Sequence, residues 1–218
     1  MRGLARFVAS VLATGGALLI ADAVVTVAWQ EPVSAWLATH EQRTLEGELA
    51  ALERRWARPA GKAVARRPST PSAAASFRRA LRTGQAIGRI ELPTLDRSYA
   101  MVHGTDATTL RKGPGHYPET PLPGEGGTVA VAGHRTTYLA PFRPIDDLAR
   151  GDRIVVRMPY GRFTYRVERT RIVAPTARWV IRPAGYERLV LTACHPLYSA
   201  AQRIVVFARL AESSSPPA

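Results

Sequence analysis

The chain has 218 residues, which is enough for one globular domain with additional segments at its ends. Its 30 lysines and arginines exceed the 17 acidic residues by 13, and Lys62 and Lys112 are the only lysines. A basic balance suits nucleic acid, an anionic membrane or an anionic cell wall, and the lack of helix-turn-helix, zinc-finger and RNP patterns argues against nucleic acid. One cysteine excludes an internal disulfide.

Residues 1–30 are expected to form a membrane anchor. The stretch 7–29 carries one charge, Asp22, and is long enough to cross the hydrocarbon layer. Arg2 and Arg6 precede it, so the positive-inside rule predicts a single-pass protein with a cytoplasmic N-terminus and the remaining chain outside. A cleaved signal peptide is the alternative, because residues 21–23 resemble a small-residue cleavage site. The apolar run continues past that site and favours a retained anchor.

Residues 31–83 are expected to connect the anchor to the main domain. Apolar residues at helical spacing predict a juxtamembrane helix over 32–58. The segment 59–76 is rich in Pro, Ala and Ser and predicts an extended linker, followed by a short helix over 77–83.

From residue 84 to residue 212 the sequence pattern consists of short apolar runs separated by Gly and Pro, which is typical of a mainly β domain. The pattern predicts seven or eight strands with few helices, arranged as a small closed barrel or a sandwich. Helical turns are expected at 108–111 and 145–148, and residues 213–218 are expected to be a disordered polar tail. The clearest strands are expected over residues 86–92, 99–102, 128–134, 152–158, 162–173, 188–194 and 203–210.

Three of these strands begin or end with side chains suited to thiol acyl transfer. Cys194 and His134 each end an apolar run, and Arg203 begins another. A thiolate is favoured by nearby cations, imidazole exchanges protons near neutral pH, and arginine offers several donors to an oxyanion. The alternatives are a structural buried thiol, a buried histidine satisfied by hydrogen bonds, and an arginine that forms a salt bridge at the edge of the barrel.

The order and spacing of these motifs resemble the sortases, which are membrane-anchored cysteine transpeptidases of Gram-positive bacteria. The matching segments are 128–134 (TVAVAGH), 191–194 (LTAC) and Arg203, within a resemblance that spans about 84–210. The loop 113–118 (GPGHYP) further resembles class E sortases of actinobacteria. The resemblance implies a closed sortase-type β-barrel of about eight strands with short helices, preceded by a transmembrane helix and a linker. Ala193 departs from the pattern, because many sortases have a threonine there.

The resemblance also implies roles for the three residues. Cys194 would attack the Thr carbonyl of a C-terminal sorting signal, Leu-Ala-X-Thr-Gly or Leu-Pro-X-Thr-Gly, in an exported protein. His134 would move protons, and Arg203 would hold the substrate and stabilise the oxyanion. An amino group of a peptidoglycan precursor, lipid II, would accept the acyl group, and neither a metal nor another cofactor would be required.

Four further residues are candidates for substrate binding. Thr192 shares a strand face with Cys194, whereas Ala193 is adjacent and faces away. His116 and Tyr117 lie on the Gly/Pro loop and either line the peptide groove or cap a turn. The remaining histidines are given structural or surface roles, His195 because it points away from the cysteine and His103 because it lies at a strand end. Zinc binding by Cys194 and the histidines is disfavoured, because the sequence has no paired ligand motif.

Two other functions stay open at this point. The first is a non-catalytic extracellular module whose basic surface binds the cell wall. The second is a thiol hydrolase that cleaves peptides without transferring them.

Overall fold

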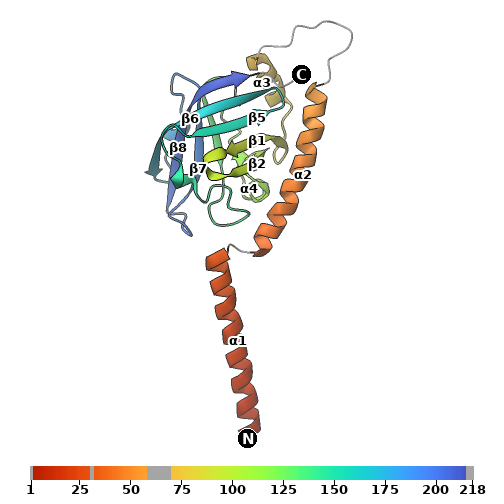
Figure 1. The fold of residues 1–218 in the computed structure, drawn as a ribbon, viewed down its shortest axis with the longest axis vertical. Helices are drawn as coiled ribbons and strands as arrows, with labels where there is room; N and C mark the ends of the chain where they lie inside the picture. Colours follow the sequence, from red (N-terminus) through yellow and green to blue (C-terminus); the bar gives the residue numbers. More distant parts are fainter. Residues whose placement is uncertain (1, 30–31, 58–69, 215–218) are drawn as a thin grey trace.

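A computed structural model of the chain describes residues 2–29, 32–57 and 70–214. Its strands form a closed barrel in the order β1-β2-β3-β4-β7-β8-β6-β5, which confirms the predicted fold class (Figure 1). The strands are β1 (Ala86–Leu92), β2 (Arg97–His103), β3 (Gly115–His116), β4 (Thr128–Ala132), β5 (Arg153–Met158), β6 (Gly161–Val173), β7 (Arg188–His195) and β8 (Gln202–Ser214).

Alternation along β7 divides its side chains between the barrel interior and an outer face. Leu189, Leu191 and Ala193 belong to the main core inside the barrel. Val190 faces outward and packs under η3 (Arg178–Ile181), together with Val180 and Phe207. Most of β7 is therefore buried on both faces, and its exposure increases only at the C-terminal end, from Cys194 onward.

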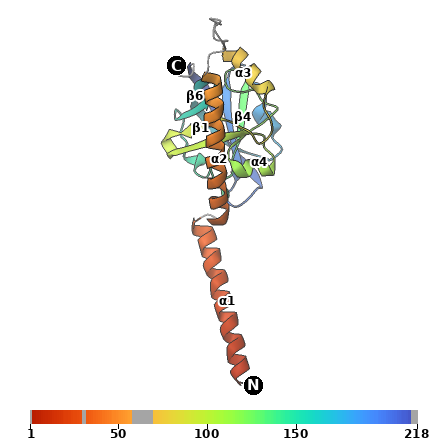
Figure 2. The same ribbon diagram turned by 90° about the vertical axis from the view of Figure 1, so that its right-hand side faces the viewer.

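The helix α1 (Arg2–Trp29) extends away from the barrel (Figures 1 and 2). Its segment Arg2–Ala23 is long and apolar enough to cross a membrane, and none of that segment is buried inside the structure. Leucines that would be costly to expose to water therefore cover a free-standing helix, as expected for a segment that has lipid around it.

The helix α2 (Pro32–Ala57) matches the predicted juxtamembrane helix, but it packs along the barrel instead of standing apart (Figure 2). Leu45 and Leu49 are each 2% exposed and pack with residues of β1 and β2. The Gln42 amide accepts from the Ala100 N–H at 2.9 Å and donates to the Ala100 and Lys112 carbonyls at 3.1 and 2.7 Å. These contacts make α2 a part of the folded domain.

The helix α3 (Thr70–Arg79) occupies part of the predicted linker, so the prediction of an extended segment up to residue 76 is wrong for residues 70–76. Ala73, Ala74 and Phe77 are buried in the main core, and the Phe77 ring lies 5.5 Å from the ring of Trp56 on α2. Burial of this apolar face stabilises a helix that its small residues alone would leave marginal. The rest of the predicted linker, 58–69, lies outside the described residues.

The C-terminal strand is longer than the sequence pattern predicts. β8 continues to Ser214, and its last residues pair with the start of β6. Ser213 and Ser214 therefore belong to the sheet and not to the expected tail, because backbone hydrogen bonding requires no apolar side chain. Residues 215–218 lie outside the described residues.

Short helices occur in the loops at both predicted positions, α4 (Ala107–Lys112) and η2 (Ile145–Asp147). A further one, η1 (Pro93–Leu95), was not predicted. Asp106 caps α4 by accepting from the backbone N–H groups of Thr108 and Thr109. β4 ends at Ala132, two residues before the predicted end, and the Phe142 ring packs so closely over Gly133 that a Cβ there would lie 2.4 Å from it.

Candidate active site

The three residues predicted to be catalytic lie at the ends of three neighbouring strands. β4 runs parallel to β7, with Ala132 opposite Thr192, and the Gly133 N–H donates to the Thr192 carbonyl at 3.0 Å. His134 follows Ala132 by two residues, as Cys194 follows Thr192. On the other side of β7, Cys194 lies directly opposite Arg203 of β8. The fold thus brings together residues separated by 60 and 9 positions in the sequence.

Alternation places Cys194 and Arg203 on the outer face of the barrel. Cys194 shares its face with Thr192, and Arg203 shares its face with Val205 and Phe207, which pack outside the barrel. Directly opposite residues of an antiparallel pair have Cβ atoms about 4.5–5.5 Å apart. Cys194 is partly exposed, so a substrate on this face can reach its sulfur beside a guanidinium group.

His134 begins the loop after β4 and is held by its backbone, since its carbonyl accepts from the Phe142 N–H at 3.0 Å. Its ring lies 5.1 Å from the Tyr138 ring, and the Arg111 guanidinium lies over the other ring of this pair at 5.7 Å. Burial, and then the charge of Arg111, lower the pKa of His134 below its usual value. The lowered pKa favours the neutral imidazole near pH 7.

The Nε2 atom of His134 is buried and has no hydrogen-bond partner in the part of the chain that the structure describes. A buried polar atom usually has a partner, and an exception calls for an explanation. The structure thus differs from the alternative in which His134 is a core histidine satisfied by hydrogen bonds. A free nitrogen on a neutral imidazole can accept a proton from a group that enters the site.

Arg203 is half-buried and uses one nitrogen to fix the turn between β7 and β8. Its Nη1 donates to the carbonyls of Ala200 and Gln202, both at 2.9 Å. In the described residues no carboxylate forms an ion pair with it, which sets it apart from the salt-bridge alternative. The turn therefore positions the guanidinium group, whose Nη2 and Nε donors have no hydrogen bond among the described residues.

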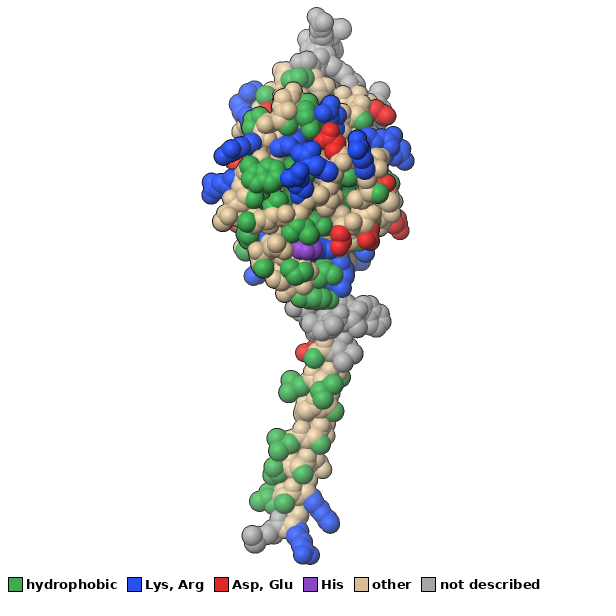
Figure 3. Space-filling view, turned by 90° about the vertical axis from the view of Figure 1, so that its left-hand side faces the viewer, with side chains coloured by type: hydrophobic (Ala, Val, Ile, Leu, Met, Phe, Trp, Pro, Cys, Tyr) green, Lys and Arg blue, Asp and Glu red, His purple; other side chains and the backbone are tan. Residues whose placement is uncertain are grey.

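Two of the four predicted substrate-binding residues meet on the outer face. The Tyr117 hydroxyl lies 3.0 Å from the Thr192 hydroxyl, and the tyrosine packs against the outer apolar cluster. Exposed apolar side chains of the neighbouring loops include Trp179, Leu197 and Tyr198. Figure 3 shows apolar groups and a histidine together on the side of the domain that carries β6, β7 and β8.

The other two predicted substrate-binding residues do not reach this face. Ala193 is 3% exposed and lies in the barrel core. His116 is 1% exposed and stacks on His103, with ring centroids 5.5 Å apart. Both placements follow from strand alternation, which directs neighbouring side chains to opposite faces.

His116 anchors the loop that carries Tyr117. Its Nε2 donates to the Pro121 carbonyl at 3.0 Å, and its Nδ1 lies 3.4 Å from the Nδ1 of His103. Burial lowers the pKa of His116 to about 4 and also lowers the pKa of His103. His103 is thus half of a neutral histidine pair and not the surface residue that its strand-end position suggested.

Beneath the outer face lies a residue that the sequence analysis missed. Arg135 follows His134 directly, is 3% exposed, and lies 3.2 Å from the Nδ1 of His195, measured from its Nη1. It also forms an ion pair with Asp146 at 2.6 Å. Its position immediately after His134 is the one sequence signal that points to it, because the next residue of an extended chain turns to the opposite side.

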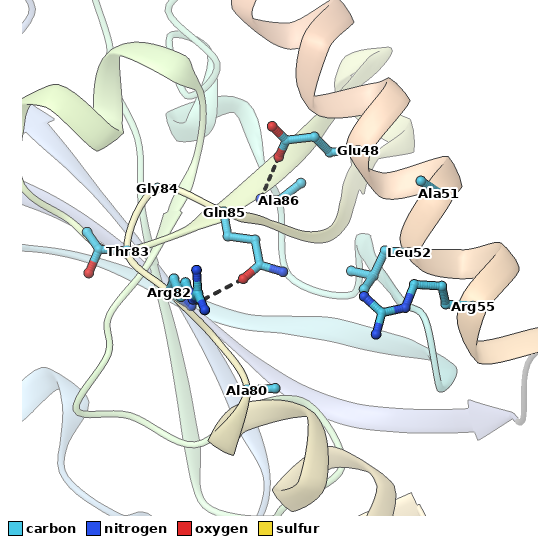
Figure 4. Close-up of a pocket in the computed structure, with 10 residues that line it drawn as sticks. All are labelled: Glu48, Ala51, Leu52, Arg55, Ala80, Arg82, Thr83, Gly84, Gln85 and Ala86. Atoms are coloured by element: carbon cyan, nitrogen blue, oxygen red, sulfur yellow. Dashed lines mark hydrogen bonds between the residues drawn. The ribbon is translucent and has the colours of Figure 1, made fainter.

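A cavity of about 730 Å³ lies on another part of the domain, between α2 and the segment that leads into β1 (Figure 4). Glu48 accepts there from the Ala86 N–H at 3.4 Å, and Gln85 accepts from the Arg82 N–H at 3.2 Å. None of the predicted site residues lines this cavity. We interpret it as the junction between α2 and the barrel.

Comparison with known proteins gives a consistent family match. A family model described as a sortase domain matches residues 90–211. Sortase D of Bacillus subtilis is 36% identical over 131 residues, which cover 58% of this chain and 65% of that protein. Sortase SrtE1 of Streptomyces coelicolor is 29% identical over 145 residues, which cover 59% of this chain and 41% of that protein. Each match therefore spans less than two thirds of the curated relative.

Solved structures give the same result. Sortase E from Streptomyces avermitilis superimposes with a TM-score of 0.56 at 32% identity, covering 62% of this chain and 93% of that one.

Proposed function

The chain belongs to the sortase family, and on that premise we propose that it is a cysteine transpeptidase that joins exported proteins to the cell wall. The observation that carries the proposal is the row of His134, Cys194 and Arg203 across β4, β7 and β8. A nucleophile, a proton carrier and an oxyanion donor at three adjacent strand ends are the groups that acyl transfer requires.

In the first half-reaction, the Cys194 thiolate attacks the Thr carbonyl carbon of the sorting signal. The tetrahedral oxyanion that forms is stabilised by the Arg203 guanidinium. The Thr–Gly bond then breaks, and the leaving amine takes a proton from the His134 imidazolium. The neutral state of free His134 favours this role, because it can first accept the thiol proton.

In the second half-reaction, an acceptor amine attacks the thioester carbon. His134 removes a proton from that amine, and the bond between carbon and sulfur breaks to release Cys194 as the thiolate. The product is a new amide between the Thr carbonyl and the acceptor, and no net redox change occurs. We propose a peptidoglycan precursor amine, such as that of lipid II, as the acceptor.

The sorting signal is proposed to be of the Leu-Ala-X-Thr-Gly or the Leu-Pro-X-Thr-Gly type. The matches to SrtE1 and to sortase E support a class E assignment, and the match to sortase D is a reason to test both signals. Tyr117 and Thr192, whose hydroxyl groups meet beside Cys194, are proposed to contact the signal.

For the cellular location, we propose that α1 is a retained single-pass anchor with its N-terminus in the cytoplasm. The charges of Arg2 and Arg6 before the apolar segment support this orientation. The barrel would then lie outside the cell, where exported proteins and wall precursors meet.

The test uses the full chain in detergent, because α2 and α3 contribute to the apolar core. The protein is incubated with each signal peptide and an excess of an amine acceptor, and mass spectrometry follows the products. A new amide at Thr that is absent with Cys194→Ala supports transpeptidation and ranks the two signals. Cleavage without transfer in the presence of several amines would favour a hydrolase. An unreactive thiol and no turnover would favour a wall-binding module.

A further inference from the structure

We infer that Arg135 and His195 form a positioning pair that sets the separation of His134 and Cys194. This inference rests on the proposed function, because it assigns the pair a role in acyl transfer. Neither residue is proposed to touch the substrate. Each immediately follows one of the two reacting residues, and their side chains meet on the opposite side of the sheet, 3.2 Å apart.

The pair lies just beyond the last backbone hydrogen bond between β4 and β7. The pairing of β4 with β7 ends at Ala132 and Thr192, and the Gly133 N–H adds one more hydrogen bond at 3.0 Å. Beyond that point, no backbone hydrogen bond within the described residues joins the chain at His134 to the chain at Cys194. The side-chain bond between Arg135 and His195 is the next link between them.

The guanidinium group of Arg135 is well suited to hold a fixed distance. Its side chain is 2% exposed. Nη2 donates to the Asp146 carboxylate at 2.6 Å and to the Arg143 carbonyl at 3.0 Å, while Nε donates to the same carbonyl at 3.2 Å. Nη1 is thereby directed at His195. A planar fork held by two partners leaves the third contact little freedom.

The contact also determines the state of His195. Arginine only donates hydrogen bonds, so the Nδ1 of His195 must be the acceptor, and a neutral ring carries its proton on Nε2. His195 is therefore a spacer whose Nδ1 is engaged by Arg135, and it is not a second base for Cys194.

The pair affects catalysis through geometry. Proton transfer between a thiol and an imidazole requires hydrogen-bond reach, and displacement by about 1 Å can reduce a rate about 100-fold. Loss of the link would leave both residues present and the substrate-binding face intact. The expected result is therefore a lower kcat with little change in KM.

The first experiment compares Arg135→Lys with wild-type protein in the transfer assay, using the full chain in detergent. Lysine keeps the charge beside Asp146 but cannot supply three directed contacts. We expect kcat to fall at least about tenfold while KM stays within about twofold. His195→Ala should have the same effect, and the double variant should lose no more than either single one, because they act as a unit.

The matched control is Arg188→Lys. Arg188 is 6% exposed, and its fork donates to Thr128 and to the Val180 and Arg182 carbonyls. It lies at the other end of β7 from Cys194. Arg188→Lys is expected to lose about as much thermal stability as Arg135→Lys, while its kcat stays within about twofold of wild type. Equal loss of kcat in the control, or additive losses in the double variant, would overturn the positioning role.

A second measurement is independent of activity. Nitrogen-15 NMR of histidine-labelled protein should show an unprotonated Nδ1 on His195 in wild type, with a changed signal in Arg135→Lys. A protonated Nδ1 in wild type would overturn the inference. If wild-type protein shows this signature but transfers no peptide, the proposed function fails and the positioning of these residues in catalysis fails with it. If wild type transfers and Arg135→Lys transfers equally well, the inference alone fails.

Discussion

At the ends of β4 and β7, the polar groups of the outer face and those of the layer beneath it differ in their hydrogen bonding. On the outer face, the Nε2 of His134 has no partner among the described residues and Cys194 is partly exposed. Beneath it, Arg135 is bonded to His195, Asp146 and the Arg143 carbonyl. The difference separates two uses of polar groups. Those without partners are available for chemistry, and those with a full set of partners fix geometry. Changes on the outer face should therefore reduce activity without reducing stability.

The largest effect is expected for His134→Gln, which should lower kcat about 1,000-fold. The free energy of unfolding should change by less than about 1 kcal/mol, because the replaced nitrogen has no hydrogen bond to lose. Steady-state transfer rates and urea unfolding measure the two quantities. His40→Gln, on the exposed side of α2, is the control and should change neither. Activity within tenfold of wild type would remove His134 from the mechanism.

His116, whose ring nitrogens have hydrogen-bond partners, should instead affect stability. Its folded-state pKa of about 4 lies below the ordinary 6.5, so the unfolded chain takes up a proton at higher pH than the folded protein. The stability that neutral His116 provides is full above pH 6.5 and is lost as the pH falls toward 4, by about 3 kcal/mol.

Urea unfolding at several pH values tests this difference. His116→Gln should flatten the decline of stability between pH 6.5 and 4, with a smaller residual slope from the other histidines whose pKa values are lowered. An unchanged slope would show that His116 is not the group that titrates.

Arg203 is expected to have the next largest effect. Arg203→Ala should lower kcat about 100-fold, because the oxyanion loses its charged donor, and Arg203→Lys should recover part of the loss. Arg209→Ala removes an exposed arginine of the same strand that pairs with Glu168, and it should leave kcat within about twofold. Equal effects of the two alanine variants would indicate a role for general surface charge in place of oxyanion stabilisation.

The smallest effect is expected for Tyr117→Phe, which removes the hydroxyl bonded to Thr192. One neutral hydrogen bond contributes about 1 kcal/mol, so KM should rise a few-fold at unchanged kcat. A double-mutant cycle with Thr192→Val checks the coupling. Additive effects of the two changes would show that the hydroxyl contact does not matter for substrate binding.

Local sequence patterns were enough to predict the barrel and the place of the candidate site. Alternation of apolar and polar residues marked β6, because a half-buried strand requires apolar side chains at every second position, and short continuous apolar runs marked β5 and β7, which are buried on both faces. His134, Cys194 and Arg203 could be predicted because each stands at the boundary of such a pattern. The apolar α1 could be predicted in the same way, from length and charge alone.

Three features could not be predicted from local patterns, because each depends on contacts between residues that are distant in the sequence. Whether α2 was a stalk or part of the domain depended on apolar partners from β1 and β2 that are distant in sequence. The helical state of residues 70–76 depended on the burial of Ala73 and Ala74. Apart from its position directly after His134, Arg135 could not be distinguished from the other arginines until the fold placed a carboxylate, a carbonyl and an imidazole around it. Local apolar patterns predict which side of a strand or helix is buried. The role of a polar residue depends on its hydrogen-bond partners, which lie far away in the sequence and come together only in the folded protein.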